Sequence, residues 1–365
     1  MLGACRKLTK RLYRMFERKV EMGNQKLRKF VRIIALFGLL GCSAQFAISS
    51  EVNIYSHRQP FLIQPFLDEF TKATGIKTNV LYSPKGLAQR LRSEGRNSPA
   101  DVILTVDIGR LAIYQDRDLL ASIESDKLHS NVPEHLRSND STWFALSKRA
   151  RIIVTSKERV AEGEITRVEQ LADPQWKGRL CSRPGSHVYN RALMASMIAH
   201  YGEEEAEKWA KGLVKNLARR PQGNDRAQVK AIFEGVCDIS IINNYYFGKL
   251  KNSDKQDQRQ WAESINLVYP NQSEGDRGSH VNISGGGIAI HSKNKADGIR
   301  LLEFLSEPVA QNLYGEINYE YPVNPQVPVV GDLATWGDFK EDQLPILAIA
   351  ELSRKAQIII DRVGW

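Results

Sequence analysis

The chain has 365 residues, enough for two domains of ordinary size, and its 42% hydrophobic content supports a buried core. Its formal charge of +9 comes entirely from residues 1–47, which carry eleven Lys and Arg residues and two acids. The other 318 residues balance 40 basic against 40 acidic groups. A nucleic-acid partner requires a basic folded surface, so this balance excludes nucleic acid as a partner.

Residues 1–47 are typical of a leader segment for export. Basic residues from Lys26 to Arg32 precede the apolar run 33–41, which fits a secretory signal and is too short to span a membrane. The basic stretch before Met22 is long for such a signal, so translation could begin at Met1 or at Met22.

The end of the leader resembles a bacterial lipobox. In the run Leu39-Leu40-Gly41-Cys42, Cys42 would become the lipidated first residue of the mature protein. Simple cleavage after Ala44 or Ala47 is the alternative. Either route predicts an exported, periplasmic protein whose only membrane contact would be a lipid anchor at Cys42.

The mature chain begins with alternating strands and helices. Hydrophobic spacing predicts strands at 52–55, 76–81 and 101–106 and helices at 61–73 and 87–94. The alternation resumes near residue 150, with expected strands at 151–155, 177–182, 238–242, 281–283 and 287–290 and expected helices at 168–172, 189–200, 203–217, 228–233, 247–250 and 296–305. Such alternation predicts a parallel sheet with helices on both faces. We expect Gly285-Gly286-Gly287 to form a tight turn or a bulge at a strand entrance.

Two similar α/β halves with a return in the middle predict a bilobal fold with a hinge, as in periplasmic binding proteins. We place the N-lobe at 51–149 plus about 275–324, and the C-lobe at 150–274 plus about 325–365. The chain would cross between lobes near Arg149–Ile152 and return near Ser273–His280. We expect a monomer.

Three tyrosines follow predicted strands in the second half. Tyr189 opens the expected helix after strand 177–182, and Tyr245 and Tyr246 follow strand 238–242. Ligands of open α/β sheets bind at the carboxyl ends of strands. A free phenol titrates near ~10, so its charged form at neutral pH needs a strong cation such as Fe3+. The alternative is that these tyrosines belong to the core or to a cleft rim.

Two cysteines remain after the leader, Cys181 and Cys237, and each stands eight residues before one of these tyrosines. In an oxidising compartment an even pair suggests a disulfide, which would tie together the strands that carry the tyrosines. Two buried thiols on neighbouring strands are the alternative.

The sequence contains none of the common catalytic or cofactor-binding motifs that would indicate an enzyme. The sequence contains no Walker-type phosphate loop, no dinucleotide-binding glycine motif, no His-Glu-x-x-His, no Cys-x-x-Cys and no Gly-x-Ser-x-Gly. A secreted enzyme on a two-lobed scaffold is therefore disfavoured.

Several blocks together resemble one family, the bacterial ferric-ion-binding periplasmic proteins that serve iron ABC transporters. The resemblance covers essentially all of 51–365. It rests on the blocks Val52–Pro60, Ser98–Val102, Lys148–Arg151, Pro221–Asp225, Asn244–Gly248 and Tyr319–Val323. It implies a two-lobed, non-enzymatic receptor that closes over one Fe3+ and works with an ABC permease and its ATPase subunits.

The resemblance also implies a ligand set. Tyr189, Tyr245 and Tyr246 match the family's metal ligands, and carbonate or another small anion can complete the shell. Arg58, Gln59 and Arg149 match positions near the cleft and are the candidate anion-binding residues. For Arg149, as for Arg151, the alternative is a surface ion pair.

One departure lies in the first loop. Many members have His-Tyr there, where this chain has Gln59-Pro60, and neither residue is an anionic ligand. This favours the subgroup that uses three tyrosines and an anion, which the cysteine pair also resembles. His57 and Tyr55 stay as further candidate ligands. A receptor for a small anion or organic ligand, with the tyrosines as stacking walls, is the alternative function.

Overall fold

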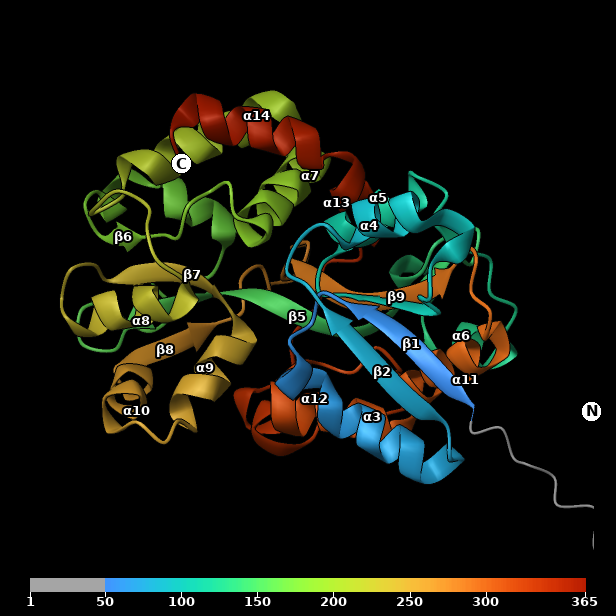
Figure 1. The fold of residues 1–365 in the computed structure, drawn as a ribbon. Helices are drawn as coiled ribbons and strands as arrows, with labels where there is room; N and C mark the ends of the chain where they lie inside the picture. Colours follow the sequence, from blue (N-terminus) through green and yellow to red (C-terminus); the bar gives the residue numbers. More distant parts are fainter. Residues whose placement is uncertain (1–49) are drawn as a thin grey trace, which may run out of the picture. The chain divides into compact units, whose positions relative to one another are not determined.

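The computed structural model describes residues 50–365, in which nine strands join into one mixed sheet (Figure 1). The strand order is β2-β1-β3-β9-β5-β7-β6, with β4 beside β9 and β8 beside β5. The strands are β1 (Glu51–Ser56), β2 (Lys77–Tyr82), β3 (Val102–Thr105), β4 (Leu120–Ala121), β5 (Trp143–Ser156), β6 (Leu180–Cys181), β7 (Ile239–Asn243), β8 (Ile265–Val268) and β9 (Val281–Ala289).

Helices cover both sides of this sheet (Figure 1). They are α3 (Pro60–Thr74), α4 (Leu87–Glu94), α5 (Ile108–Gln115), α6 (Asp126–Asn131), α7 (Val188–Lys215), α8 (Asp225–Phe233), α9 (Asn244–Lys251), α10 (Gln256–Glu263), α11 (Lys295–Ser306), α12 (Pro308–Asn318), α13 (Ile346–Glu351) and α14 (Ser353–Val363). Around β1 and β2, α3 and α12 lie on one side of the sheet and α4 and α5 on the other (Figure 1). The predicted α/β class is confirmed.

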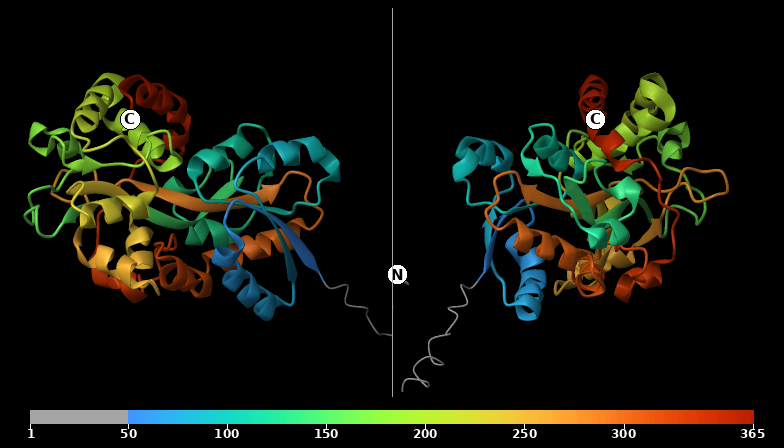
Figure 2. Two further views of the ribbon diagram at one scale, coloured as in Figure 1. Left: turned by 60° about the vertical axis from the view of Figure 1, so that its left-hand side comes forward. Right: turned by 90° about the vertical axis from the view of Figure 1, so that its right-hand side faces the viewer.

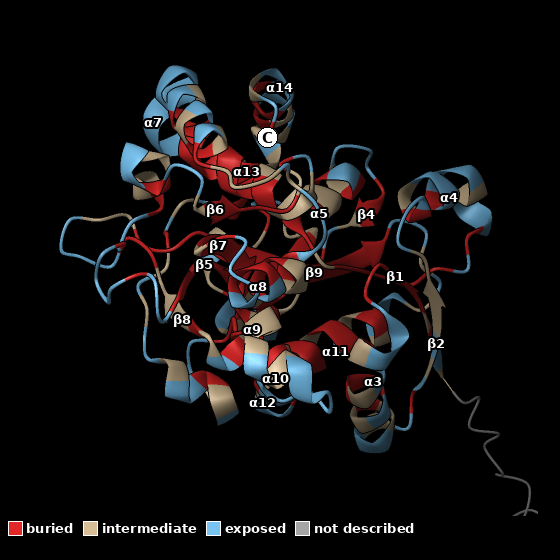
Figure 3. Cartoon of the chain, turned by 90° about the vertical axis from the view of Figure 1, so that its left-hand side faces the viewer, coloured by how far each residue is buried: buried red, intermediate tan, exposed pale blue. Residues whose placement is uncertain are grey.

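The long strand β5 runs through the whole sheet and is almost entirely buried (Figure 3). Its first part, Trp143–Ala150, pairs with β9, and its last part, Arg151–Ser156, pairs with β7 and β8. The change of partner falls between Arg149 and Arg151. Both arginines are therefore placed where the two parts of the sheet meet.

The sheet is mixed, so the prediction of a parallel sheet is wrong in part. Strands β2, β1 and β3 are parallel to one another, as are β6 and β7. Strands β5 and β9 run antiparallel to their neighbours. The alternation rule assumes that each helix crosses over to an adjacent parallel strand, whereas β9 returns from far along the chain and inserts between β3 and β5.

The three glycines Gly285, Gly286 and Gly287 lie inside β9, so the expected turn at a strand entrance is wrong. A Cβ on Gly287 would lie 2.5 Å from the Thr142 carbonyl oxygen, and one on Gly286 would lie 2.8 Å from the Ile103 carbonyl oxygen. Glycine is required because the neighbouring strands approach too closely for a side chain. The bulge is real, since the register with β5 shifts beside these glycines, between Ala145 and Ser147.

Helix α7 corresponds to the two helices predicted at 189–200 and 203–217. Gly202 interrupts it with the non-helical angles φ 80° and ψ 168°. Its first stretch is among the most buried parts of the chain (Figure 3). Helix α14 lies along α7 (Figure 2), and the Arg191 guanidinium of α7 donates to the Gln357 side chain of α14 at 3.3 Å.

Cys181 and Cys237 form a disulfide, which confirms the predicted pairing. Cys181 ends β6 and Cys237 comes two residues before β7, so the bond staples two paired strands. The sequence separation is 56 residues. Closing a loop of this length lowers the entropy of the unfolded chain and stabilises the fold by about 4 kcal/mol.

The leader, with its alternative starts and the lipobox cysteine Cys42, lies outside the described residues. Within residues 50–365 no helix is long and apolar enough to cross a membrane. Residues 50–365 form a single unit of contacts, and the lobe boundaries given above stay a prediction.

Candidate functional site

The three tyrosines meet at the carboxyl ends of β6 and β7. These two strands are parallel neighbours, with Leu180 beside Ile239 and Cys181 beside Ser240. A loop connects β6 to α7, and β7 leads directly into α9. Because the two strands are adjacent and parallel, the starts of the two helices lie side by side. Tyr189 is the second residue of α7, and Tyr245 and Tyr246 are the second and third residues of α9.

Two of the three phenol oxygens, those of Tyr245 and Tyr189, are in direct contact. The Tyr245 hydroxyl donates to the Tyr189 hydroxyl at 2.9 Å, and the rings of Tyr245 and Tyr246 lie 4.5 Å apart between centroids. His187 fixes the start of α7, because its ring nitrogen Nδ1 accepts from the Tyr189 backbone N–H at 3.3 Å. Local capping and strand pairing thus place residues that are 56 positions apart within hydrogen-bonding distance.

A cavity of about 710 Å³ contains all three tyrosines. The sequence-predicted residues His57, Arg58, Gln59 and Arg149 also line it. The cavity is also lined by four charged residues that the sequence did not predict, namely Arg110, Arg226, Lys249 and Glu320. The segment that carries Arg58 comes from the beginning of the chain, so the cavity joins distant parts of the sequence.

Tyr55 lies outside this cavity, which corrects its candidacy as a ligand. Its ring is buried in the core, and its hydroxyl donates to the Glu94 carboxylate at 2.8 Å. Tyr55 lies inside β1, whereas that strand ends at Ser56, so His57 belongs to the following loop and faces a different space.

His57 lines the cavity, but both of its ring nitrogens already have partners. Nδ1 contacts the Ser83 carbonyl oxygen at 2.9 Å and must donate to it. Nε2 then accepts from the Tyr114 hydroxyl at 3.0 Å. Burial, together with the charge of Arg110, lowers the pKa of His57 to about 4. The ring is therefore neutral at neutral pH, and coordinating a metal would require breaking a hydrogen bond.

Arg58 is engaged by the protein itself. Its guanidinium donates to the Glu320 carboxylate at 2.7 Å and to the Ser284 hydroxyl at 2.6 Å. Burial is the largest influence on Glu320, yet the charge of Arg58 and its hydrogen bond hold the pKa of Glu320 below its usual range. Gln59, the next residue, is exposed at the start of α3. Arg58 thus reaches the cavity with much of its charge already balanced.

Arg149 is buried and is not a surface residue. Its guanidinium donates to the backbone oxygen of Val106 and, at 3.4 Å, to Ser284. Its charge lies 3.9 Å from the Asp107 carboxylate. Asp107 in turn caps the first turn of α5, so Arg149 is tied to the start of that helix.

Arg151 forms a buried ion pair, which excludes the surface pair considered above. Its guanidinium donates to Asp225 at 2.6 Å and to the Asn190 side chain at 2.6 Å. Arg183 donates to the other oxygen of Asp225 at 2.8 Å. Asp225, which is fully buried, also accepts the backbone N–H of Asn243 at 2.9 Å.

This Asp225 network joins the two tyrosine-bearing segments. Asn190 follows Tyr189, and Asn243 ends β7 two residues before Tyr245. Sequence reasoning missed the network because it pairs residues from four separate segments. The only signal was the family block Pro221–Asp225, which carried no assigned role.

Positive charge surrounds the phenols. The guanidinium carbons of Arg149, Arg151 and Arg183 lie 5.9, 5.8 and 4.8 Å from the centre of the Tyr189 ring. Arg226 lies 5.6 Å from the Tyr246 ring, and the Lys249 ammonium lies 5.7 Å from the Tyr245 ring. Lys249 is four residues after Tyr245 on α9, which is the spacing that puts side chains on one helix face.

Burial favours protonated phenols despite these cations. Burial, and then the neighbouring Tyr189, raises the pKa of Tyr246 to about 12. Burial raises the pKa of Tyr245 well above its usual range, and Tyr189 and Tyr246 add to that rise. Several phenolates side by side would repel one another, so the cluster needs a cation at its centre in order to ionise.

Three of the cavity's cations have no carboxylate partner. Within residues 50–365, no carboxylate oxygen lies within 4.0 Å of the charged nitrogens of Arg110, Arg226 or Lys249. The Nε of Arg226 is buried and has no hydrogen-bond partner among the described residues. The cavity therefore has unbalanced positive charge beside its phenols.

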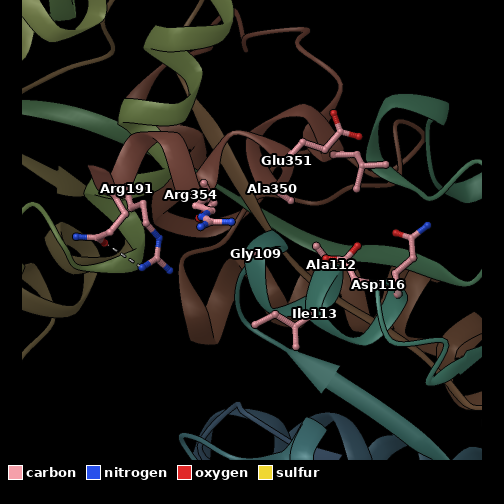
Figure 4. Close-up of a pocket in the computed structure, with 12 residues that line it drawn as sticks. Gly109, Ala112, Ile113, Asp116, Arg191, Ala350, Glu351 and Arg354 are labelled. Atoms are coloured by element: carbon pink, nitrogen blue, oxygen red, sulfur yellow. Dashed lines mark hydrogen bonds between the residues drawn. The ribbon is translucent and has the colours of Figure 1, made fainter. Parts of the chain in front are cut away.

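The described residues offer no alternative metal site built from the usual ligand side chains. In the described part of the chain, no three His, Cys, Asp or Glu side chains gather in a way that could hold a metal ion. A second cavity of about 720 Å³ lies between α5, α13 and α14 (Figure 4). It is lined by two carboxylates, Asp116 and Glu351, and by no tyrosine, histidine or cysteine. Three phenols that can ionise line the tyrosine cavity, whereas this second cavity offers two carboxylates.

Comparisons with known proteins agree with this chemistry. The family model for "Bacterial extracellular solute-binding protein" matches residues 97–339. Iron uptake protein A1 of Synechocystis is 42% identical over 86% of this chain and 87% of its own length. A Trichodesmium protein solved in complex with iron and citrate ligands has a TM-score of 0.83 at 43% identity, covering 87% of this chain and all of that one. Ferric iron-binding protein A of Mannheimia haemolytica, in an open conformation, has a TM-score of 0.81 at 46% identity, covering 86% and 98%.

The Asp225 network gives a test of stability. Asp225→Asn leaves two buried guanidiniums without their carboxylate, so we expect the free energy of unfolding to fall by about 3–5 kcal/mol. Denaturant unfolding of the purified protein measures this, with the exposed Asp254→Asn as the matched control. Equal stability of the two variants would show that Asp225 does not hold the segments together.

Proposed function

This chain belongs to the family of bacterial extracellular solute-binding proteins, and we propose that its ligand is Fe3+, bound by the phenolates of Tyr189, Tyr245 and Tyr246. The protein would capture the ion outside the cytoplasm and deliver it to an ABC permease and its ATPase subunits. The observation that carries the proposal is the contact of two phenol oxygens at 2.9 Å inside a cavity that also holds the third phenol and several cations.

The ligand set suits the charge and hardness of Fe3+. Three phenolates neutralise the ion, and phenolate oxygen is a hard donor. Divalent ions prefer carboxylates, carbonyls, imidazoles or thiolates. Within residues 50–365, no three His, Cys, Asp or Glu side chains gather in a way that could hold a metal ion. No bond-making chemistry is needed, so the activity is capture and release by a receptor and not catalysis.

We further propose that a small anion completes the iron shell. Once three phenolates have balanced the ion, Arg110, Arg226 and Lys249 still lack an anionic partner. Carbonate or a carboxylate such as citrate would supply that charge, and arginine grips such planar groups with paired hydrogen bonds. Because Arg58 and Arg149 already have protein partners, Arg226 and Lys249 are stronger candidates for this role than the predicted Arg58, Gln59 and Arg149.

Release would follow from weakening the same interactions. In the predicted lobes, the tyrosines belong to the C-lobe, and Arg58 and Gln59 belong to the N-lobe. Closure of the lobes would exclude water and strengthen the charge interactions around the ion. Protonating or displacing the anion, or reducing Fe3+, would loosen the site and permit transfer to the permease. A lipid at Cys42 would keep the receptor near that permease.

The receptor for a small anion or organic ligand stays the alternative. It would use the cations and treat the tyrosines as walls. Equilibrium dialysis with metal analysis separates the two functions, because only the iron receptor retains stoichiometric iron.

The first prediction concerns Tyr245. Replacing it with Phe removes one phenolate, so we expect ferric affinity to fall by more than about 100-fold, since even residues that only support a metal ligand contribute 10–100-fold. The visible phenolate-to-iron absorption band should weaken as well. Tyr201→Phe is the control, because Tyr201 is exposed and its hydroxyl donates to Glu169 outside the cavity. Unchanged affinity in Tyr245→Phe would remove this residue from the ligand set.

The second prediction concerns pH. Burial raises the pKa of Tyr246 to about 12 and raises the pKa of Tyr245 well above its usual range, so both phenols carry protons at neutral pH that Fe3+ must displace. Protons therefore compete with iron, and ferric affinity should fall as the pH falls, by about one log unit per pH unit for each of the three phenols that loses a proton on binding. The measurement is a series of ferric-binding isotherms at different pH values in the presence of a competing chelator, corrected for the chelator's own pH dependence. It gives the slope of log affinity against pH. Tyr245→Phe should release one proton fewer, and a wild-type affinity independent of pH would contradict phenolate ligation.

The third prediction concerns the anion. We expect added bicarbonate or citrate to raise the ferric affinity of the wild type, and Arg226→Gln to reduce that gain by about tenfold or more, as expected for a lost charge-assisted hydrogen bond. Competition with a ferric chelator at fixed pH measures the gain. Arg300→Gln is the control, since Arg300 lies half-exposed on α11. An equal gain in both variants would show that Arg226 does not hold the anion.

A further inference from the structure

The segment Tyr319–Glu320 contacts both parts of the proposed iron site, although it contributes no predicted ligand. It follows α12 and belongs to a family block that sequence analysis left without a role. Glu320 accepts from Arg58 at 2.7 Å. Tyr319 lines the cavity and packs on α9, the helix that carries Tyr245 and Tyr246.

The contact between Tyr319 and α9 leaves no room for a side chain. A Cβ placed on Gly248 of α9 would lie 2.4 Å from Cγ of Tyr319 and 2.5 Å from its Cδ1. The aromatic ring thus rests directly on the helix backbone. Gly248 is three residues after Tyr245, so the ring presses on the turn that carries the ligands.

Tyr319 holds its ring there through an uncommon backbone conformation. Its φ is 55° and its ψ is 36°, the left-handed region that large side chains rarely adopt. Its carbonyl oxygen accepts from the Asn244 side-chain amide at 2.9 Å. The same Asn244 side chain accepts the backbone N–H of Ala150 in β5 at 2.9 Å, which ties the first turn of α9 to the sheet.

The far end of α9 is held by the same part of the chain. The Asn252 side chain donates to Asp332 at 2.5 Å, and the Lys251 ammonium lies 3.5 Å from that carboxylate. Trp336 stacks on Tyr319 with ring centroids 6.2 Å apart and meets the Phe247 ring edge-on at 5.3 Å.

We propose that Tyr319 is a positioning residue for the iron ligands, which acts by seating α9 through Gly248 while Glu320 holds Arg58. The inference rests on the proposed function. Two neighbouring residues, Tyr319 and Glu320, would then set the positions of Tyr245 and Tyr246 relative to Arg58. A purely structural contact would affect stability alone, whereas this one also sets the geometry of the phenolates.

The test is a double-mutant cycle. Gly248→Ala adds a methyl group where the Tyr319 ring lies, so it should displace α9, weaken ferric affinity by about tenfold or more and shift the visible absorption band. Tyr319→Gly removes the ring and suits the left-handed backbone. In that background, Gly248→Ala should change affinity by less than about twofold, the usual error of additivity.

Gly212→Ala is the matched control. Gly212 is a helix glycine of α7 whose added Cβ would lie 2.6 Å from Cβ of Ala172, remote from the cavity. It should lower the melting temperature of the iron-free protein and leave the absorption band of the ferric form in place. A band shift in this control, a wild-type band and affinity in Gly248→Ala, or an effect of Gly248→Ala that is as large in the Tyr319→Gly background as in the wild type would each overturn the proposal.

Two further outcomes are also decisive. If Gly248→Ala does not fold, Tyr319→Gly decides alone, because an unchanged band and affinity would overturn the proposal and a shifted band with weaker binding would support it. If the wild type binds no Fe3+, the proposed function fails. Hydrogen exchange of the α9 amides in the iron-free proteins then decides the seating of α9. The supporting result is faster exchange in Gly248→Ala than in the wild type, with no further acceleration when Gly248→Ala is added to Tyr319→Gly.

Discussion

The buried carboxylate of Asp225 is the constraint on which the site depends. It accepts hydrogen bonds from Arg151, Arg183 and the backbone of Asn243 at 2.6–2.9 Å, and Arg151 extends the network to Asn190. The two turns that present the tyrosines are thereby fixed to each other. A buried carboxylate with two arginines also leaves net positive charge behind Tyr189, where a phenolate must form.

The site contains two sets of groups, the phenols and the cations without carboxylate partners, and within each set like charges would repel one another unless a ligand of opposite charge is bound. Phenols side by side resist ionisation, and cations without carboxylate partners repel one another. A trivalent cation bound by phenolates, with an anion beside it, satisfies both sets of groups at once. This complementarity explains how a cavity without a single carboxylate-rich cluster would hold a highly charged metal, and it makes binding sensitive to protons and to anions.

The proposed iron site also depends on contacts between segments that are far apart in the sequence. Strand β5 brings Arg149 and Arg151 to the point where its pairing changes from β9 to β7. The segment Tyr319–Glu320 brings a ring to α9 and a carboxylate to Arg58. The proposed ligands are therefore held by residues that are distant in the sequence, so binding geometry and folding are coupled.

The sequence by itself determined the α/β class, the bounds of α3, α4 and α11, the disulfide and the three tyrosines after two strands, because hydrophobic period, export and strand-to-helix turns are local signals. It did not predict α5, α6, α10, α12, α13 or α14. It misjudged the sheet direction, the place of Gly285–Gly287 and the position of Tyr55, and it did not find Asp225, Arg226 or Lys249 as parts of the site. Strand order and the partner of a buried charge depend on which distant segments pack together. Only the tertiary structure decided those, since no local pattern records the neighbour across a sheet or a cavity.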